Sequence, residues 1–138
     1  MREIKKIVIH HSASVQGRGV DAATIHEWHM AAPRKWSGIG YHHVILESGE
    51  IQHGRPHYWM GAHAKGHNKA SIGICLIGDF TKEQMTPMQN SSLRKLLLAL
   101  FEMYPSVTIH GHRDLMEEGY TECPGFEVAD YLISIGLT

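Results

Sequence analysis

Two kinds of hydrophobic pattern occur along this chain of 138 residues. Apolar runs of about four to eight residues, rich in β-branched side chains, are typical of buried strands, whereas apolar positions three and four apart are typical of helices. Runs of the first kind occur at residues 3–10, 41–47, 50–53, 71–78 and 107–110. The run at 71–78 is almost wholly apolar, which favours a central strand covered on both faces.

The clearest helix begins near residue 86. Thr86 as N-cap, Pro87 at the first helical position and Gln89 three residues after the cap form a capping box. Apolar positions with helical spacing follow at Leu93, Leu96, Leu97, Leu100 and Phe101. This stripe predicts a helix with one face in the core.

Two shorter helices are expected on either side of it. Asp21 offers an N-cap for a helix that should end before Pro33, with one face made of Ile25, Trp28 and His29. Residues 126–135 show the same spacing. The order of elements predicts an α/β fold: a single domain over residues 1–138, with a small mixed central β-sheet flanked by α-helices.

Composition excludes several classes of protein. The formal net charge of -1 gives no general field for nucleic acid or an anionic membrane surface. The chain shows neither a signal-peptide run nor an apolar span near 18 residues. We therefore expect a monomer made in the cytoplasm, with no nucleic-acid partner and no stable membrane association.

Twelve histidines are unusual for this length, but a lone histidine is most often a surface or hydrogen-bonded core residue. His26 and His29 flank a glutamate on the first helix at a spacing of three, not the four of a zincin motif, so helix packing is expected. Cys75 lies inside an apolar run and is expected to be a buried, unpaired thiol. Trp36, in a loop, fits either a substrate contact or simple packing.

Three segments carry the residue types of a metal site. They are 9–12, with His10 and His11, 111–114, with a histidine, and 121–125, with a cysteine. A thiolate and imidazoles are ligands that zinc takes in hydrolytic sites, where three protein ligands leave a fourth position for water. Successive strand side chains point to opposite faces, so at most one of His10 and His11 faces a given site, and sequence parity leaves the choice open.

Several motifs together resemble the N-acetylmuramoyl-L-alanine amidase type 2 family, which includes amidase-type phage lysozymes and peptidoglycan recognition proteins. The resemblance runs from about residue 7 to residue 126. The motifs are Ile9-His10-His11-Ser12-Ala13, Gly40-Tyr41-His42, Gly61-Ala62-His63-Ala64-Lys65-Gly66 with Asn68, Ser71-Ile72-Gly73-Ile74, Gly78-Asp79-Phe80, Gly111-His112-Arg113-Asp114 and Thr121-Glu122-Cys123-Pro124-Gly125.

The resemblance implies roles for particular residues. It implies that zinc is bound, at one edge of the sheet, by His10, His112 and Cys123. It implies a catalytic tyrosine at Tyr41 and a second catalytic position at Thr121, where some phage enzymes have lysine. Substrate contacts are expected at His63 and Asn68, in a loop that lines the family's substrate groove, and Trp36 is a further candidate.

The implied activity is zinc-dependent hydrolysis of the amide bond between the lactyl group of N-acetylmuramic acid and L-alanine of the stem peptide in peptidoglycan. The compact form is most similar to a phage or prophage endolysin, which would act on the cell wall after release, with help from a membrane-permeabilising partner. Zn²⁺ suits this reaction because it can polarise a carbonyl and make hydroxide available near neutral pH. Asp114 could support a ligand imidazole.

Three alternatives remain open at this stage. A structural zinc would need a fourth protein ligand, which His11 or His110 could supply. A peptidoglycan-binding module without cleavage is another, although such relatives typically lack the cysteine that this chain keeps. The third is a different zinc hydrolase on the same fold.

Overall fold

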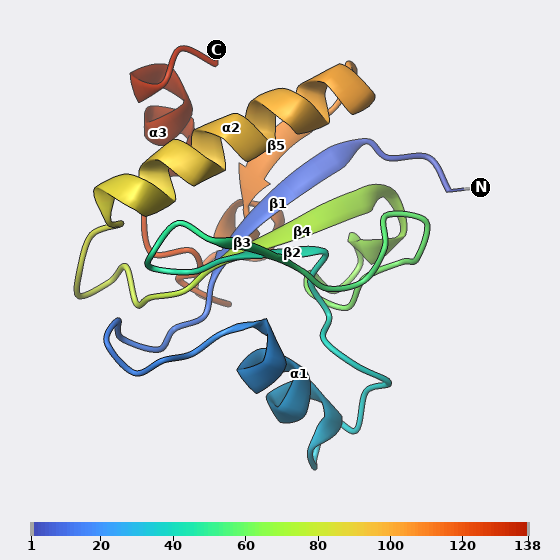
Figure 1. The fold of residues 1–138 in the computed structure, drawn as a ribbon. Coiled ribbons are helices and arrows are strands. Elements are labelled where there is room, and N and C mark those ends of the chain that lie inside the picture. The colour runs from blue at the N-terminus through green and yellow to red at the C-terminus, as the bar shows by residue number, and fades with distance from the viewer. Residues whose placement is uncertain (1, 138) are drawn as a thin grey trace.

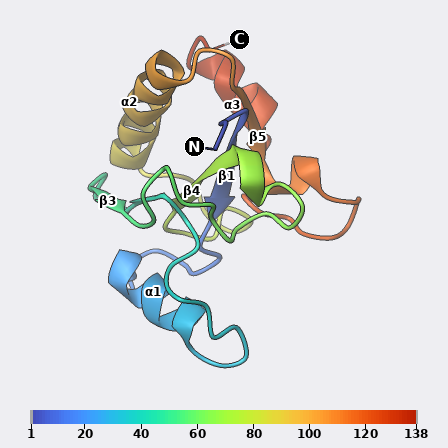
Figure 2. The same cartoon turned by 90° about the vertical axis from the view of Figure 1, so that its right-hand side faces the viewer.

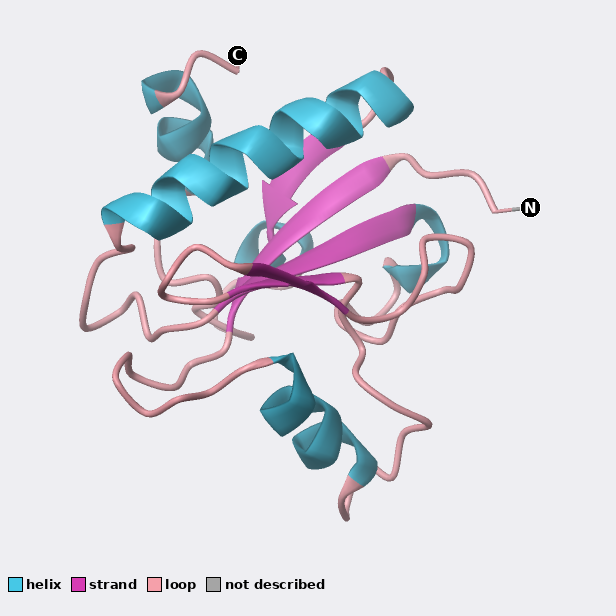
Figure 3. Ribbon diagram, in the orientation of Figure 1, coloured by secondary structure: helices cyan, strands magenta, loops and turns pink. Residues whose placement is uncertain are grey.

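The chain forms one five-stranded sheet in a computed structural model that describes residues 2–137. The strand order is β3-β2-β4-β1-β5, and all neighbours are parallel except the β2–β3 hairpin (Figures 1 and 3). The strands are β1 Lys6–His11, β2 His43–Ile45, β3 Ile51–His53, β4 Ser71–Leu76 and β5 Thr108–Gly111. The mixed sheet expected from the sequence is confirmed.

Helices cover both faces of the sheet. They are α1 Ala22–Met30, α2 Pro87–Met103 and α3 Val128–Ser134, with short 3-10 turns η1 at Asn68–Ala70 and η2 at His112–Leu115. Helices α2 and α3 lie on one side, and α1 lies on the other (Figures 1 and 2). Helix α2 begins with the expected capping box at Thr86 and Gln89, and four of its leucines are buried against the sheet: Leu93, Leu96, Leu97 and Leu100.

The two-residue period of the strands decides which side chains face each layer. Ile7 and Ile9 of β1 pack into the core under α2 and α3, in register with Ile72 and Ile74 of β4. The alternate residues face the α1 side. His10 is therefore on that side, in register with Cys75.

Helix α1 differs from expectation in one residue. Ile25 and His29 are buried, but Trp28 is 43% exposed. The buried residues of α1 are Ile25 and His29 alone, and the chain after α1 folds back against the histidines: the Ile39 N–H donates to His26 Nδ1 at 3.1 Å, and the Gly40 N–H donates to His29 Nδ1 at 2.9 Å. His29 therefore packs as expected, whereas His26 is an exposed acceptor of a backbone hydrogen bond, and neither belongs to the metal-capable group.

A chain of histidines joins the hairpin to the end of α2. His43 lies 3.0 Å from His53 through the Nδ1 atoms and 2.6 Å from His57 through the Nε2 atoms, and His57 Nδ1 lies 2.9 Å from the Tyr104 hydroxyl. A neutral imidazole has one donor and one acceptor, so neutral rings satisfy every contact when all donate in the same direction. Burial lowers the pKa of His43 to about 3, with His57 and His53 adding to the effect.

Buried neutral histidines such as His43 should make the free energy of unfolding fall as pH drops from 7 to 5. Unfolded histidines take up protons near pH 6.5, whereas folded His43 stays neutral down to its pKa of about 3, and His42, whose pKa burial lowers to about 4, behaves alike. The unfolded state therefore binds more protons in this window, so acid favours unfolding. Each such histidine contributes up to about 1.4 kcal/mol per pH unit, a slope that is reached only below the unfolded pKa of about 6.5.

Urea unfolding at pH 7 and pH 5 would measure this effect, with a chelator present throughout so that metal release does not contribute. His43→Asn should unfold with a shallower dependence on pH than the unaltered chain. An unfolding free energy that is the same at both pH values would contradict the expectation.

Candidate active site

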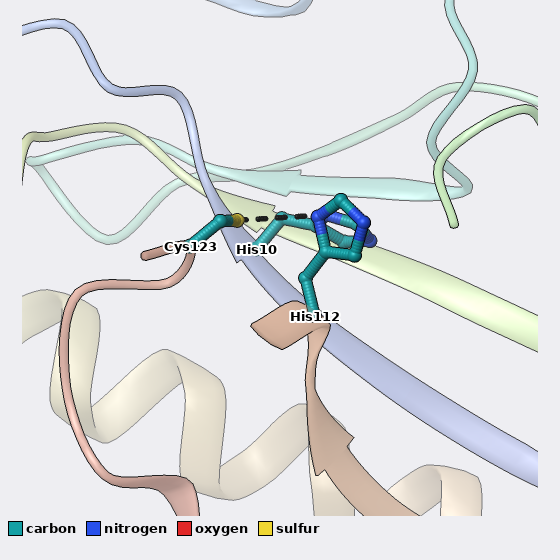
Figure 4. A group of neighbouring side chains, drawn as sticks. All are labelled: His10, His112 and Cys123. Atoms are coloured by element: carbon teal, nitrogen blue, oxygen red, sulfur yellow. Dashed lines mark hydrogen bonds between the residues drawn. The ribbon is translucent and has the colours of Figure 1, made fainter. Parts of the chain in front are cut away.

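The structure brings together three side chains that could hold a metal ion: His10, His112 and Cys123 (Figure 4). One ligand atom from each lies within 4.8 Å of the others. His10 belongs to β1, and His112 directly follows β5, whose Gly111 pairs with Ile9. Parallel pairing of β1 and β5 thus places both histidines at the carboxyl ends of neighbouring strands.

Close packing fixes the third member of the cluster. Cys123 accepts the Arg113 N–H through its carbonyl at 2.8 Å, which holds its loop against η2. A Cβ on Gly111 would lie 2.9 Å from Pro124 Cδ, so this turn can approach β5 only because residue 111 is glycine. Gly125 has a φ of +88°, and a Cβ there would lie 2.7 Å from the backbone of Phe80.

The donor geometry fits zinc. Zn–S and Zn–N bonds of about 2.3 and 2.0–2.1 Å at a tetrahedral angle separate the two donor atoms by about 3.6 Å. The observed distance from Cys123 Sγ to His10 Nδ1 is 3.6 Å. This pair of donors is therefore spaced for such an ion, and the His112 donor lies within 4.8 Å of both.

The protonation states of the cluster follow from its burial. Burial, and then the neighbouring His63, His112 and His11, hold the pKa of His10 well below its usual value, so the imidazole is neutral, as a metal ligand must be. Burial raises the pKa of the Cys123 thiol to about 12, although the His11 N–H and Arg113 oppose the shift. A metal ion that binds here has to displace the thiol proton.

The residues considered as fourth ligands lie elsewhere. The His11 ring points away from His10, and its Nδ1 accepts the Phe80 N–H at 3.1 Å. His110 Nε2 lies 2.7 Å from the Thr108 hydroxyl. Within residues 2–137, the metal-capable group holds three side chains and no fourth, which is the arrangement of an open site.

The cluster lies in a cleft of about 710 Å³. The cleft is lined by all eight residues that the sequence analysis selected: His10, Trp36, Tyr41, His63, Asn68, His112, Thr121 and Cys123. Arg34, Lys65 and Tyr120 also line it and had been given no role. Their signal in the sequence was weak, since each is an ordinary surface residue type in a loop.

Tyr41 and Thr121 both offer hydroxyl groups to the cleft. The Tyr41 ring lies 5.0 Å from the His10 ring between centroids. Burial, with smaller contributions from Cys75 and Cys123, raises the pKa of Tyr41 well above its usual value, so the phenol keeps its proton and can donate it in a hydrogen bond. Thr121 Oγ1 accepts the Cys123 N–H at 3.1 Å, and the hydroxyl hydrogen remains available to donate.

Trp36 and Asn68 have structural contacts as well as places in the cleft. The Trp36 ring packs edge-on against His29, with centroids 4.6 Å apart, and the Arg34 guanidinium lies 5.7 Å from its centroid. Asn68 Oδ1 accepts the N–H groups of His63 and Ala64, each at 2.9 Å. The Asn68 carbonyl is therefore committed to shaping its loop.

Asp114 does not reach a ligand imidazole. Its Oδ2 accepts the Gly111 N–H at 2.9 Å and caps the turn η2. The nitrogen of His10 that faces away from Cys123 instead meets His63 Nδ1, at 2.8 Å. Sequence reasoning missed this contact, because residues 10 and 63 meet only through the folded sheet.

Three side chains that could hold a metal ion lie on the wall of an open cleft, beside two hydroxyl groups, an arrangement typical of metal-dependent hydrolases. The family profile described as N-acetylmuramoyl-L-alanine amidase matches residues 1–126. The chain therefore belongs to this family of hydrolases that act on amides.

Relatives support this assignment in sequence and in structure. The endolysin of Enterobacteria phage T3 is 34% identical over 127 residues, which are 88% of this chain and 81% of the relative. The solved amidase endolysin LysCS from Clostridium intestinale is 33% identical with a TM-score of 0.86, covering 99% of this chain and 86% of that one. A mutant of Drosophila PGRP-LB in complex with tracheal cytotoxin is 30% identical with a TM-score of 0.80, covering 96% and 82%.

Proposed function

We propose that this protein is a zinc-dependent endolysin that cleaves the amide bond between the lactyl group of N-acetylmuramic acid and L-alanine in peptidoglycan. The observation that carries the proposal is the spacing of the His10, His112 and Cys123 donors within the cleft. The amidase and endolysin relatives, which match most of the chain, support the bond type and the polymer.

The donor set suits amide hydrolysis. A bound zinc ion would polarise the carbonyl of the amide and lower the pKa of water, and two neutral imidazoles with one thiolate would leave it a net charge of about +1. His10, His112 and Cys123 would hold the ion. In the bound state both imidazoles would be neutral and the sulfur would be deprotonated, and these three side chains would take no other part in the reaction.

Tyr41 is proposed to donate a hydrogen bond to the carbonyl oxygen of the amide as that oxygen gains negative charge. Its buried phenol is protonated at neutral pH, so it donates without first having to take up a proton. Thr121 is proposed to assist through its hydroxyl hydrogen, since the Cys123 N–H fixes the direction of its oxygen. Trp36, His63 and Asn68 form walls against which the muropeptide would lie.

The place of action is proposed from the relatives. Phage proteins named endolysins match nearly the whole chain, which supports action on the cell wall after release. Synthesis in the cytoplasm and help from a membrane-permeabilising partner are part of the proposal. We propose that the enzyme acts as a monomer. Among residues 2–137, no helix has both the length and the apolar character needed to cross a bilayer.

The proposal is tested with purified protein and isolated peptidoglycan, with and without a chelator. Free amino groups and reducing ends are assayed separately. We expect new N-terminal alanine, no new reducing sugar, and loss of the reaction with chelator that added Zn²⁺ restores. Tight binding to peptidoglycan without cleavage at any zinc concentration would instead identify a recognition module, with Tyr41 and Thr121 as contacts.

A further inference from the structure

His63 lies beside the metal-capable cluster, in the middle of the segment that leads from β3 to β4. Its Nδ1 is 2.8 Å from His10 Nε2, and its Nε2 is 3.3 Å from the Ser71 hydroxyl. The two imidazole rings meet edge to face, with centroids 4.9 Å apart. Ser71 is fully buried, and His10 is 1% exposed. The contact between the rings is therefore partly shielded from competing water.

The surroundings hold the His63 ring in one place. A Cβ on Gly73 of β4 would lie 2.7 Å from the ring, and a Cβ on Gly61 would lie equally close. The ring therefore rests directly on backbone at both positions. Asn68 fixes the backbone of the loop by accepting the His63 N–H at 2.9 Å.

This arrangement decides which nitrogen of His10 carries its hydrogen. Nδ1 of His10 faces Cys123 Sγ at 3.6 Å, so it is the nitrogen that has to be free for a metal ion. The hydrogen must then be on Nε2 and must be donated to His63 Nδ1. His63 in turn carries its own hydrogen on Nε2, where the Ser71 hydroxyl accepts it.

The opposite arrangement would block the site. If His63 carried its hydrogen on Nδ1, it would donate to His10 Nε2 and leave the His10 hydrogen on Nδ1, where a metal ion would have to bind. The Ser71 hydroxyl, which can accept as well as donate, gives the His63 Nε2–H a hydrogen-bond partner in the productive arrangement.

We propose that His63 is a positioning residue for the metal site, which selects the metal-binding tautomer of His10 by accepting its Nε2–H and is itself oriented by Ser71. The inference rests on the proposed zinc site. His63 acts through His10, so a contact with substrate is not required for its effect.

The test is metal affinity, measured with Zn²⁺ alone by competition with a chromophoric chelator. His63→Ala should bind Zn²⁺ about 10- to 100-fold more weakly, the loss typical of removing a hydrogen-bond partner of a metal-bound histidine. His63→Asn should recover most of the affinity, because its side-chain oxygen can accept near the position of Nδ1. Cobalt absorption spectra of the same variants would report changes in ligand geometry.

His43→Ala is the matched control. His43 is also buried and also contacts other imidazoles, but those are His53 and His57, not a member of the cluster. It should lower stability and leave zinc affinity unchanged. If His63→Ala does not fold, Ser71→Ala retains both imidazoles and should weaken zinc binding by a smaller factor.

Wild-type zinc affinity in folded His63→Ala or Ser71→Ala, or equal losses in His63→Ala and His63→Asn, would overturn the proposal. These outcomes are separate from failure of the proposed function. An unaltered chain that binds zinc but cleaves nothing would refute the amidase assignment and leave the His63 measurement valid. An active amidase whose His63 variants keep full zinc affinity would refute only the role of His63.

Discussion

Cys123→Ser should lose both stoichiometric zinc binding and amidase activity. The serine hydroxyl is too weak an acid to replace a thiolate as a ligand near neutral pH, and the two remaining imidazoles would have to hold the ion alone. The loss should exceed the roughly 100-fold effect of removing an outer partner, because a direct ligand is removed. Activity should fall to background.

Metal content after dialysis and release of amino groups from peptidoglycan measure the two effects. Cys75→Ala is the control: it removes the other unpaired thiol, which is fully buried in β4 and is not a member of the cluster. It should keep one bound zinc ion per chain. Retention of both zinc and cleavage by Cys123→Ser would show that the thiolate is not a ligand.

Tyr41→Phe should lower kcat by about 100- to 1000-fold, equivalent to about 2.7–4 kcal/mol, the usual effect of losing one donor to a developing oxyanion. The substitution removes only the hydroxyl, and the ring that packs 5.0 Å from His10 remains. Zinc affinity should therefore be unchanged, and KM should change little, because the interaction strengthens on the way to the transition state.

Steady-state kinetics on a soluble muropeptide, together with zinc titration, would separate these effects. Tyr58→Phe makes the same chemical change at a tyrosine that is 71% exposed and outside the cleft, and it should behave as the unaltered chain. A rise in KM with kcat preserved would assign Tyr41 to substrate binding instead.

Local physical chemistry made the elements of the fold predictable. The capping box at Thr86 acts within four residues, and the apolar run at 71–78 could be buried only as a central strand. The exposure of Trp28 could not be predicted in this way, since it depends on where the chain after α1 folds back. Contacts between separate elements in general cannot be predicted from local sequence, because they depend on how the elements are arranged in the fold.

In the candidate site too, the residue types could be predicted from the sequence, whereas the contacts between distant segments could not. Residue types and spacing indicated a histidine and cysteine site, but alternation alone could not choose between His10 and His11, and family resemblance made that choice. In the structure, His10 lies in the cluster and His11 bonds to Phe80. The contact between His10 and His63 had no sequence signal, because 53 residues separate them and only the register of β1 and β4 brings the two regions together.

The order of the cluster members along the chain has a consequence for biosynthesis. His10 is translated well before His112 and Cys123, and β1 is in place between β4 and β5 only after both of these strands exist. A nascent chain that has been translated only as far as residue 100 carries one member of the cluster, His10. It lacks the part of the cleft wall that residues 112–123 supply. Translation products that end before residue 112 should therefore be hydrolytically silent.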